Sequence, residues 1–265
     1  MDTCYRHPGR ETGVSCSNCA NPICTDCMTS TSVGMRCPEC ARERTKVHTV
    51  SSMTGTPTAT YALIAINALV FLGSSSTSGA TLRDFALFGP SVDAANEYYR
   101  LVSSGFLHGG IIHILFNMYI LHWLGSQLEP SLGTPRFVAL YFASLLAGSF
   151  GALLLSPMSL TVGASGAVFG LMAATFVTQR ARGIDPMQSG IGPLILLNLA
   201  IGFIPGLNIS IGGHLGGLIG GALAAMLMDR LGARRRGVVL PIAACVLVGV
   251  IAVAGSLAVA GRVVG

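Results

Sequence analysis

The sequence predicts an all-α protein that crosses a membrane several times and carries a small zinc-binding domain before its membrane part. Three observations support this fold class. Of the 265 residues, 51% are hydrophobic and only 10% are charged, whereas soluble domains carry about 25% charged residues. Apolar runs of roughly 17 to 25 residues, the length that spans a bilayer, recur after residue 56. Seven of the eight cysteines stand before residue 41.

The composition divides the chain into three parts. Residues 1–44 hold the cysteine-rich domain, residues 45–56 are charged and then rich in Ser and Thr, and residues 57–260 hold the apolar runs. We expect the middle part to be a linker. Seven runs are predicted to be transmembrane helices, and they lie at 57–73, 108–128, 136–156, 161–179, 190–206, 209–228 and 237–260.

Basic residues are divided unequally between the two sides that seven crossings define. Thirteen of the 16 Lys and Arg residues fall on the side of the N-terminus. Because basic residues accumulate in cytoplasmic loops, we expect the N-terminus in the cytoplasm. The net charge of +5 then needs no nucleic-acid partner, and the run RLGARRR at 230–236 predicts contact with anionic membrane lipids.

The cysteines of the first part have the spacing of metal ligands. Four pairs of the form Cys-x2-Cys or Cys-x2-His supply eight side chains: Cys4 and His7, Cys16 and Cys19, Cys24 and Cys27, and Cys37 and Cys40. Eight ligands suffice for two tetrahedral zinc sites. Disulfides are the alternative, but they are rare in the cytoplasm. A domain of about 40 residues buries little core, so we expect two structural zinc ions to supply most of its folding energy.

Polar side chains inside apolar runs are costly and therefore informative. His113 and Asn117 lie four residues apart in the second run. Ser165 lies in the fourth run and His214 in the sixth. These runs cross in the same direction, and His113, Ser165 and His214 each lie within roughly 10 Å of the outer boundary. Their shared depth predicts a single site.

Glycine spacing predicts that the fourth and sixth runs touch. Gly166 and Gly170 are four residues apart, and Gly213, Gly217 and Gly221 repeat this spacing. Small residues at such intervals let membrane helices approach closely. By the same argument, Ser165 can also be interpreted as no more than a small packing residue.

The residue types favour nucleophilic chemistry over packing alone. A serine hydroxyl becomes a nucleophile when an adjacent base removes its proton, and His214 is the candidate base. No Asp or Glu lies at that depth in the three runs, so a Ser–His dyad is predicted. The Asn117 amide, His113 and the Ser165 backbone N–H are candidate donors to an oxyanion.

Three motifs together resemble the rhomboid family of intramembrane serine proteases: GASG at 163–166, HGGIIHILFN at 108–117 and GHLGGLIGG at 213–221. The resemblance covers about residues 57–260 and implies a six-helix core followed by a seventh, C-terminal transmembrane helix. It implies cleavage of transmembrane protein substrates near their extracytoplasmic end, with Ser165 as nucleophile and His214 as general base.

The resemblance also implies supporting roles. His113 and Asn117 would stabilise the oxyanion, and Phe169 would stack on His214. His108 would help to organise the site, together with the motif glycines Gly163, Gly166 and Gly217. The family further implies a structural acid at Glu129, a partly embedded loop over 74–107 with Tyr99-Arg100 in place of its usual Trp-Arg, and a mobile gate over 190–211.

The cysteine-rich part resembles a B-box-type zinc finger over residues 4–40, although its last pair is Cys-Cys where B-boxes usually present histidines. In that family the pairs interleave, so Cys4 and His7 would share one ion with Cys24 and Cys27. The remaining four cysteines would hold the second ion. This part of the sequence contains no catalytic apparatus, so we expect a binding or regulatory role, with a cytoplasmic protein as partner.

The sequence therefore predicts an intramembrane serine endopeptidase, with the bacterial cell membrane as the expected location and an organellar membrane as the alternative. The alternative is a non-catalytic rhomboid-like protein that binds client helices and recruits cytoplasmic partners through its zinc finger. A transporter using His113 and His214 as a proton relay leaves the GASG motif unexplained. Two aromatic residues, Tyr61 and Tyr141, are predicted to anchor the protein at the membrane interface.

Overall fold

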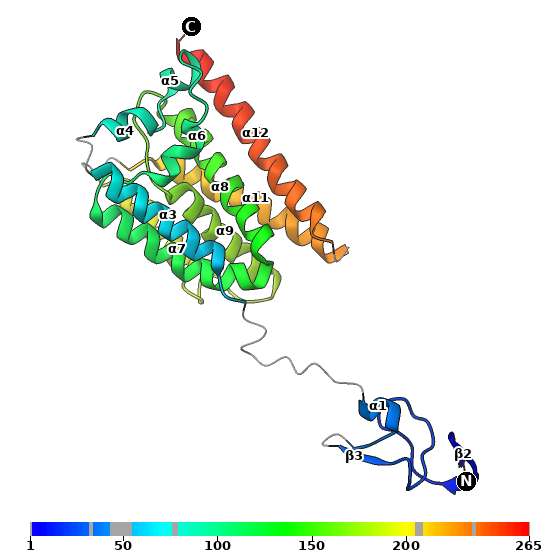
Figure 1. The fold of residues 1–265 in the computed structure, drawn as a ribbon. Helices are drawn as coiled ribbons and strands as arrows, with labels where there is room; N and C mark the ends of the chain where they lie inside the picture. Colours follow the sequence, from blue (N-terminus) through cyan, green and yellow to red (C-terminus); the bar gives the residue numbers. More distant parts are fainter. Residues whose placement is uncertain are drawn as a thin grey trace. The chain divides into compact units, whose positions relative to one another are not determined.

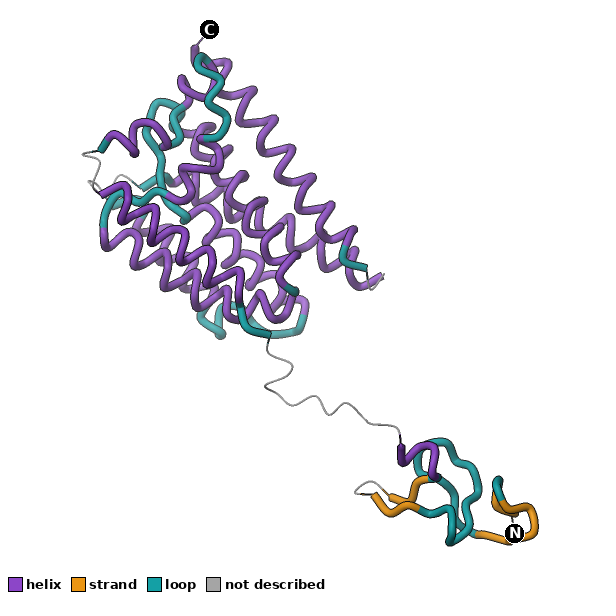
Figure 2. The backbone as a smooth tube through the Cα atoms, viewed as in Figure 1, coloured by secondary structure: helices purple, strands orange, loops and turns teal. Residues whose placement is uncertain are grey.

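The computed structural model describes residues 2–31, 34–42, 55–75, 79–204, 209–234 and 237–264. The chain forms two compact units, Met1–Met53 and Thr54–Gly265, which are described separately (Figures 1 and 2). Most of the predicted linker lies outside the described residues.

The first unit consists of two short hairpins and one helical turn. Strands β1 (Asp2–Cys4) and β2 (His7–Thr12) pair antiparallel, as do β3 (Thr29–Thr31) and β4 (Gly34–Arg36), and α1 (Pro38–Arg42) follows. Its buried cluster consists of Ile23 and six of the seven cysteines. With so few aliphatic residues inside, the unit has only a small apolar core of its own.

The second unit is a helical bundle whose long helices match the seven predicted runs. These are α3 (Thr58–Ser75), α7 (Ile111–Leu132), α8 (Thr134–Leu155), α9 (Ser165–Ala181), α10 (Ile191–Ile201), α11 (Ile211–Arg234) and α12 (Val239–Val264). Helices α3 and α7 lie side by side, and α12 runs along the opposite side of the bundle (Figure 1).

The lengths of these helices differ from the prediction of seven full spans. Within the described residues, α3, α8, α11 and α12 are long and apolar enough to cross a membrane, and α7 becomes a fifth candidate only when joined to the preceding short helices across a 95° bend. Helix α9 begins at Ser165 rather than 161, because the backbone of Thr161 pairs with Leu87 instead of entering the helix. Helix α10 has only 11 residues.

The loop before α7 is folded into short helices, which are α4 (Ala80–Phe85), α5 (Gly89–Asp93), α6 (Arg100–Ser103) and the 3-10 turn η1 (Ser104–Phe106). The buried Arg100 side chain donates hydrogen bonds to the carbonyl oxygens of Arg83 and Ala86, both at 2.7 Å, and pairs with Glu97 at 2.6 Å. The Tyr99 hydroxyl donates to a carbonyl oxygen of α4 at 3.0 Å. The side chains of Tyr99 and Arg100 thus hold α6 and the residue before it against α4.

Helices α8, α9 and α11 meet through glycine. A Cβ added to Gly217 of α11 would overlap the carbonyl oxygen of Gly166 of α9, and one added to Gly221 would overlap the backbone of Gly170. The predicted contact between these two helices is confirmed. The neighbouring glycine Gly216 instead faces α8, where a Cβ would overlap the carbonyl oxygen of Ala147.

Helix α8 is surrounded by α7, α9, α11 and α12, which overturns one sequence prediction. Tyr141 of α8 is fully buried, with 0% of its surface exposed, so its assignment as an interfacial anchor is wrong. Its side chain packs in the apolar core of the bundle instead of facing the surface. Tyr61 of the outer helix α3 is 47% exposed and stacks on the His122 ring at 5.8 Å.

Glu129 joins the last turn of α7 to the start of α3. Its carboxylate accepts hydrogen bonds from the backbone N–H groups of Ala59 and Thr60, at 2.9 and 2.8 Å, and from the hydroxyls of Thr60 and Thr134, at 2.8 and 2.9 Å. The first N–H groups of a helix have no partner within that helix. Glu129 satisfies two of them and places a negative charge at the positive end of α3.

We expect Glu129→Gln to destabilise the membrane unit by about 1–3 kcal/mol, because the side-chain amide turns a donor toward groups that themselves donate. Thermal unfolding of the purified protein in detergent measures this change. Gln127→Ala, at an exposed position of the same helix, is the matched control and should unfold like the wild type. An unchanged melting temperature for Glu129→Gln would contradict the capping role.

Candidate active site and metal sites

Ser165 is the first residue of α9, and the segment before it is held by the folded loop. Leu87 and Thr161 exchange two backbone hydrogen bonds, at 3.0 and 2.9 Å, and the N–H of Gly163 donates to the carbonyl oxygen of Ser104 at 2.9 Å. Gly163 has φ +125°, a conformation that residues with a side chain rarely adopt. The half-buried Ser165 thus stands at the positive end of its helix, where backbone N–H groups lack helical partners.

His214 lies in the first turn of α11 and is only 7% exposed. Its ring stacks on that of Phe169, with centroids 4.1 Å apart and planes 22° from parallel. Phe169 belongs to α9, one turn after Ser165. The stacking and the glycine contact between the two helices therefore fix the His214 ring relative to the start of α9.

No hydrogen bond joins Ser165 to His214 among the described residues, and the Nδ1 atom of His214 has no partner there either. Catalytic hydrogen bonds are often long in ligand-free sites and tighten when substrate binds. The structure brings the two helices together without forming the bond itself.

His113 lies directly over Gly163. A Cβ added to Gly163 would lie 2.8 Å from both Cε1 and Nε2 of His113 and 3.7 Å from the Ser165 hydroxyl oxygen. The imidazole and the serine hydroxyl therefore border the same small space above the Gly163 backbone. Glycine at 163 is needed both for its backbone angle and for the room that His113 occupies.

Two more predicted residues lie next to His113. The side-chain amide of Asn117, a buried residue, donates one hydrogen bond to the His113 carbonyl oxygen at 2.9 Å, which leaves its second N–H for another acceptor. The ring of His108, 2% exposed, packs edge-on against the His113 ring at 5.0 Å. An imidazole that precedes α7 and an amide within α7 thus gather around His113.

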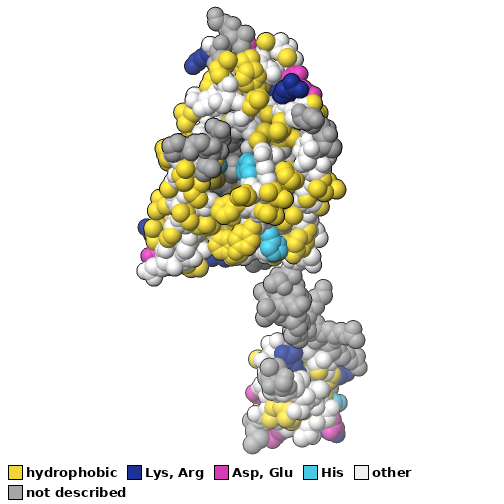
Figure 3. Space-filling model, turned by 90° about the vertical axis from the view of Figure 1, so that its left-hand side faces the viewer, with side chains coloured by type: hydrophobic (Ala, Val, Ile, Leu, Met, Phe, Trp, Pro, Cys, Tyr) yellow, Lys and Arg dark blue, Asp and Glu magenta, His cyan; other side chains and the backbone are white. Residues whose placement is uncertain are grey.

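A small pocket borders Ser165. It offers about 20 Å³ to water-sized molecules, and its lining includes Ser165, Gly163, Ser104, Ser149 and Gly213. This is room for about one water molecule. The space-filling view of the membrane unit shows a hollow with a histidine side chain inside it (Figure 3).

Comparison with known proteins assigns the fold. A family model described as the rhomboid domain matches residues 95–231, just over half of the chain. The chain belongs to the rhomboid family. The matched segment contains Ser165, His214 and the residues around them, whereas α12 and the cysteine-rich unit of this rhomboid lie outside it. Together with the apolar helices, membership makes the chain an integral membrane protein.

Several relatives of this rhomboid are similar over the membrane part. It is 35% identical over 200 residues to rhomboid protease GluP of Bacillus subtilis (strain 168), across 72% of this chain and 39% of the relative. It is 37% identical over 143 residues to rhomboid protease GlpG of Yersinia pestis (strain Pestoides F), across 52% and 51%. It is 36% identical over 157 residues to RHOMBOID-like protein 6, mitochondrial, of Arabidopsis thaliana, across 57% and 50%. The matched region thus spans between 39% and 51% of the length of these relatives.

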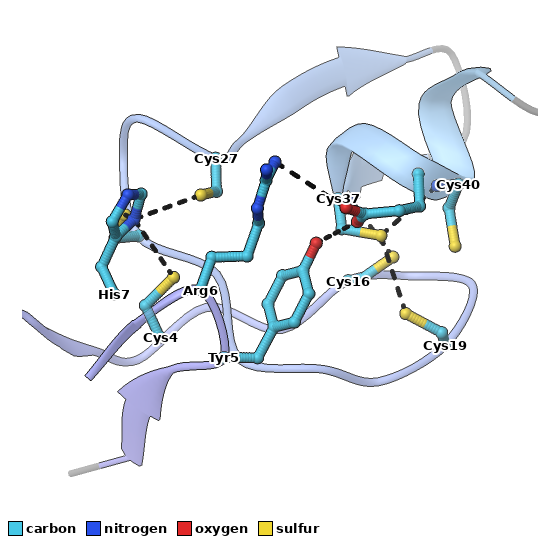
Figure 4. A network of polar contacts seen from close by, with 11 residues as sticks. Cys4, Tyr5, Arg6, His7, Cys16, Cys19, Cys27, Cys37 and Cys40 are labelled. Atoms are coloured by element: carbon cyan, nitrogen blue, oxygen red, sulfur yellow. Dashed lines mark hydrogen bonds and ion pairs between the residues drawn. The ribbon is translucent and has the colours of Figure 1, made fainter.

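The first unit holds two groups of side chains that could each bind a metal ion. One group is Cys4, His7, Cys24 and Cys27, and the other is Cys16, Cys19, Cys37 and Cys40, with the ligand atoms of each group within 4.8 Å of one another. Figure 4 labels seven of these side chains, which come from the first hairpin, from the loop between the two hairpins, and from the start of α1. This interleaved grouping is the one that the B-box resemblance implies. All eight cysteines of the chain are free of disulfides.

The distances fit a tetrahedral ion. The Nδ1 atom of His7 lies 3.4 Å from the sulfurs of Cys24 and Cys27 and 3.9 Å from that of Cys4. In the other group, the sulfurs of Cys19 and Cys37 are 3.8 Å apart. Ligand atoms around a tetrahedral zinc ion are about 3.5–3.8 Å apart, given its bond lengths to sulfur and nitrogen.

The ionisation of the thiols also favours a bound cation. Backbone N–H groups of Cys37 and Cys19 lower the pKa of the Cys16 thiol to about 6. In the other group, burial and the neighbouring thiol of Cys24 raise the pKa of Cys27 to about 11. Thiolates this close together repel one another, and a divalent ion removes that repulsion.

A contact that sequence analysis missed joins the two groups. Glu39, between Cys37 and Cys40, accepts a hydrogen bond from the Tyr5 hydroxyl, and its carboxylate lies 3.7 Å from the Arg6 guanidinium (Figure 4). Tyr5 and Arg6 stand between the first ligand pair. The chain segments that carry the two groups are therefore tied to each other.

We expect Gly217→Ala to destabilise the membrane unit by about 1–3 kcal/mol, because the added methyl group has to push α11 away from α9. Thermal unfolding in detergent is the measurement. The matched control is Gly73→Ala in α3, where no described atom lies within 4 Å of the added Cβ. Equal melting temperatures for the two variants would contradict the close packing.

We expect the purified chain to carry two metal ions and Cys24→Ser to carry one or none, because loss of a thiolate opens one site and the Glu39 contact couples the two. Metal content is measured by mass spectrometry of the elements. Cys245→Ser, at a buried position in α12, controls for the loss of a thiol. Two ions in Cys24→Ser would exclude this cysteine as a ligand.

Proposed function

We propose that this chain is an intramembrane serine endopeptidase, which cleaves transmembrane segments of membrane proteins near their extracytoplasmic end. The observation that carries the proposal is the His214 ring, stacked on Phe169 at 4.1 Å beside the helix that starts with Ser165. A structural serine would need no oriented imidazole. The names of two relatives, rhomboid proteases GluP and GlpG, support the same activity.

In the proposed reaction, Ser165 and His214 act as a dyad. The Ser165 hydroxyl oxygen attacks the carbonyl carbon of the scissile peptide while His214 takes the hydroxyl proton. The resulting imidazolium then gives this proton to the leaving amine, which departs as the C–N bond breaks. A water molecule, deprotonated by His214, attacks the acyl-enzyme and releases the carboxyl product and the free serine.

The groups around His113 are suited to stabilise the oxyanion of the tetrahedral intermediate. The backbone N–H of Ser165 belongs to the first turn of α9, so it lacks a helical acceptor. His113 borders the space next to the serine hydroxyl, and Asn117 keeps one amide N–H unused by its own helix. Preorganised donors of this kind typically contribute about 3–4 kcal/mol each to catalysis.

Substrate entry is proposed to involve α10, the predicted gate. This helix has 11 residues, and among the described elements its main neighbour is α9. Leu196, Leu197 and Phe203 expose more than half of their surface. A short helix with one main neighbour can move at a smaller energetic cost than α8, which contacts α7, α9, α11 and α12.

For the cysteine-rich unit we propose two structural zinc ions and a cytoplasmic protein partner. Thiolates with one imidazole suit zinc better than hard cations. In this proposal residues 1–44 form the zinc-binding domain, 45–56 the linker and 57–260 the membrane domain. The distribution of basic residues supports a cytoplasmic N-terminus in the bacterial cell membrane.

A fluorophosphonate probe tests the proposed nucleophile. We expect labelling of the wild type in membranes, none of Ser165→Ala, and at least about 100-fold slower labelling of His214→Ala. Phe169→Leu should slow labelling less, because it frees the His214 ring without removing it. Ser159→Ala, at an exposed serine of the preceding loop, should label like the wild type.

Folded wild type that stays unlabelled, while a rhomboid protease labels in parallel, would exclude the endopeptidase. The remaining hypothesis would be a membrane protein that binds client helices without cleaving them, and Ser165 would be a packing residue.

A further inference from the structure

An apolar groove runs along the membrane unit between α8 and α12. It has a volume of about 470 Å³, and its described lining is entirely apolar, including Ala139, Phe142 and Leu146 from α8 and Val250 and Leu257 from α12. Small residues create it, since Gly249 and Ala254 stand where larger side chains of α12 would close the gap. The groove is independent of the Ser165 site, and α12 lies outside the matched rhomboid domain.

The groove has a basic end. Arg136 lies three residues before Ala139, about one turn nearer the start of α8. Its Nη2 atom donates to the carbonyl oxygen of Gly237 at 3.0 Å, while its Nε atom is buried and has no partner among the described residues. Gly237 directly follows the arginines at 234–236 in the sequence.

Arg136 has no acidic partner within the described part of the chain. A guanidinium presents its N–H groups as a fork that matches the oxygens of a phosphate. Arginines at a membrane surface also attract anionic lipids, by about 1 kcal/mol each. The positive charge at the end of the groove thus favours an anion. The apolar lining along the groove favours a hydrocarbon chain.

We propose that this groove binds an anionic phospholipid, with one acyl chain between α8 and α12 and the phosphate at Arg136. A transmembrane helix of a second copy is the rival occupant. It would cover the apolar lining but would bring no anion to the Arg136 guanidinium, which has no acidic partner among the described residues, whereas a lipid phosphate supplies one. A free phosphate ion would satisfy Arg136 and leave the groove itself unexplained.

Native mass spectrometry of the full chain in detergent tests the proposal with two lipids of equal acyl chains, dioleoyl phosphatidylglycerol and dioleoyl phosphatidylcholine. We expect preferential retention of phosphatidylglycerol by the wild type. Arg136→Gln should weaken it about tenfold, as expected for loss of a hydrogen bond to a charged group. Ala254→Phe should weaken both lipids, because the ring fills the groove.

Two matched variants control for charge and for size. Arg182→Gln removes an exposed arginine at the end of α9, and Ala258→Phe adds a ring to α12 one turn beyond Ala254, outside the groove. Both should bind phosphatidylglycerol like the wild type. Melting temperatures show whether each variant is folded, and the two test variants probe opposite ends of the site.

Three results would overturn the proposal. Equal retention of both lipids by the wild type, together with unchanged retention of phosphatidylglycerol by Arg136→Gln, would remove the headgroup site. Full competition by glycerol phosphate at the concentration of the lipid would reduce the site to a phosphate ion. A dimer that Ala254→Phe dissociates would assign the groove to a second copy of the chain.

Discussion

The backbone contact of α8, α9 and α11 at glycine is the constraint on which the rest of the membrane unit depends. Lipid tails are as apolar as the helices, so burial alone does not drive helices together in a bilayer, and close van der Waals packing has to do so. Gly166 follows Ser165, and His214 lies between Gly213 and Gly217. The residues that let the helices touch are thus the immediate neighbours of the proposed dyad, so packing and catalysis share one geometry.

The second constraint is the irregular backbone that leads into α9. Non-helical backbone at membrane depth is tolerated only where protein satisfies its polar groups. Here the folded loop does so, through the Leu87–Thr161 pair and the bond from Gly163 to Ser104. The loop is in turn held by the buried Arg100. The segment before Ser165 can therefore remain non-helical without leaving its backbone polar groups unpaired.

Sequence periodicity was sufficient to predict the helices and the contact of α9 with α11, because each depends on spacing along one helix. It did not reveal which distant segments pair. The carboxylate of Glu129 binds the start of α3, about 70 residues earlier, with no local signal for this contact. Tyr141 shows the same limit, since an aromatic residue in an apolar run has one pattern whether its helix is central or peripheral.

The two units obtain their stability by different physical means. The membrane unit is held by helix contacts that require no ligand, and the rhomboid match at 95–231 falls wholly inside it. The first unit has a core of cysteines, so ions that bind its folded form shift its stability by mass action.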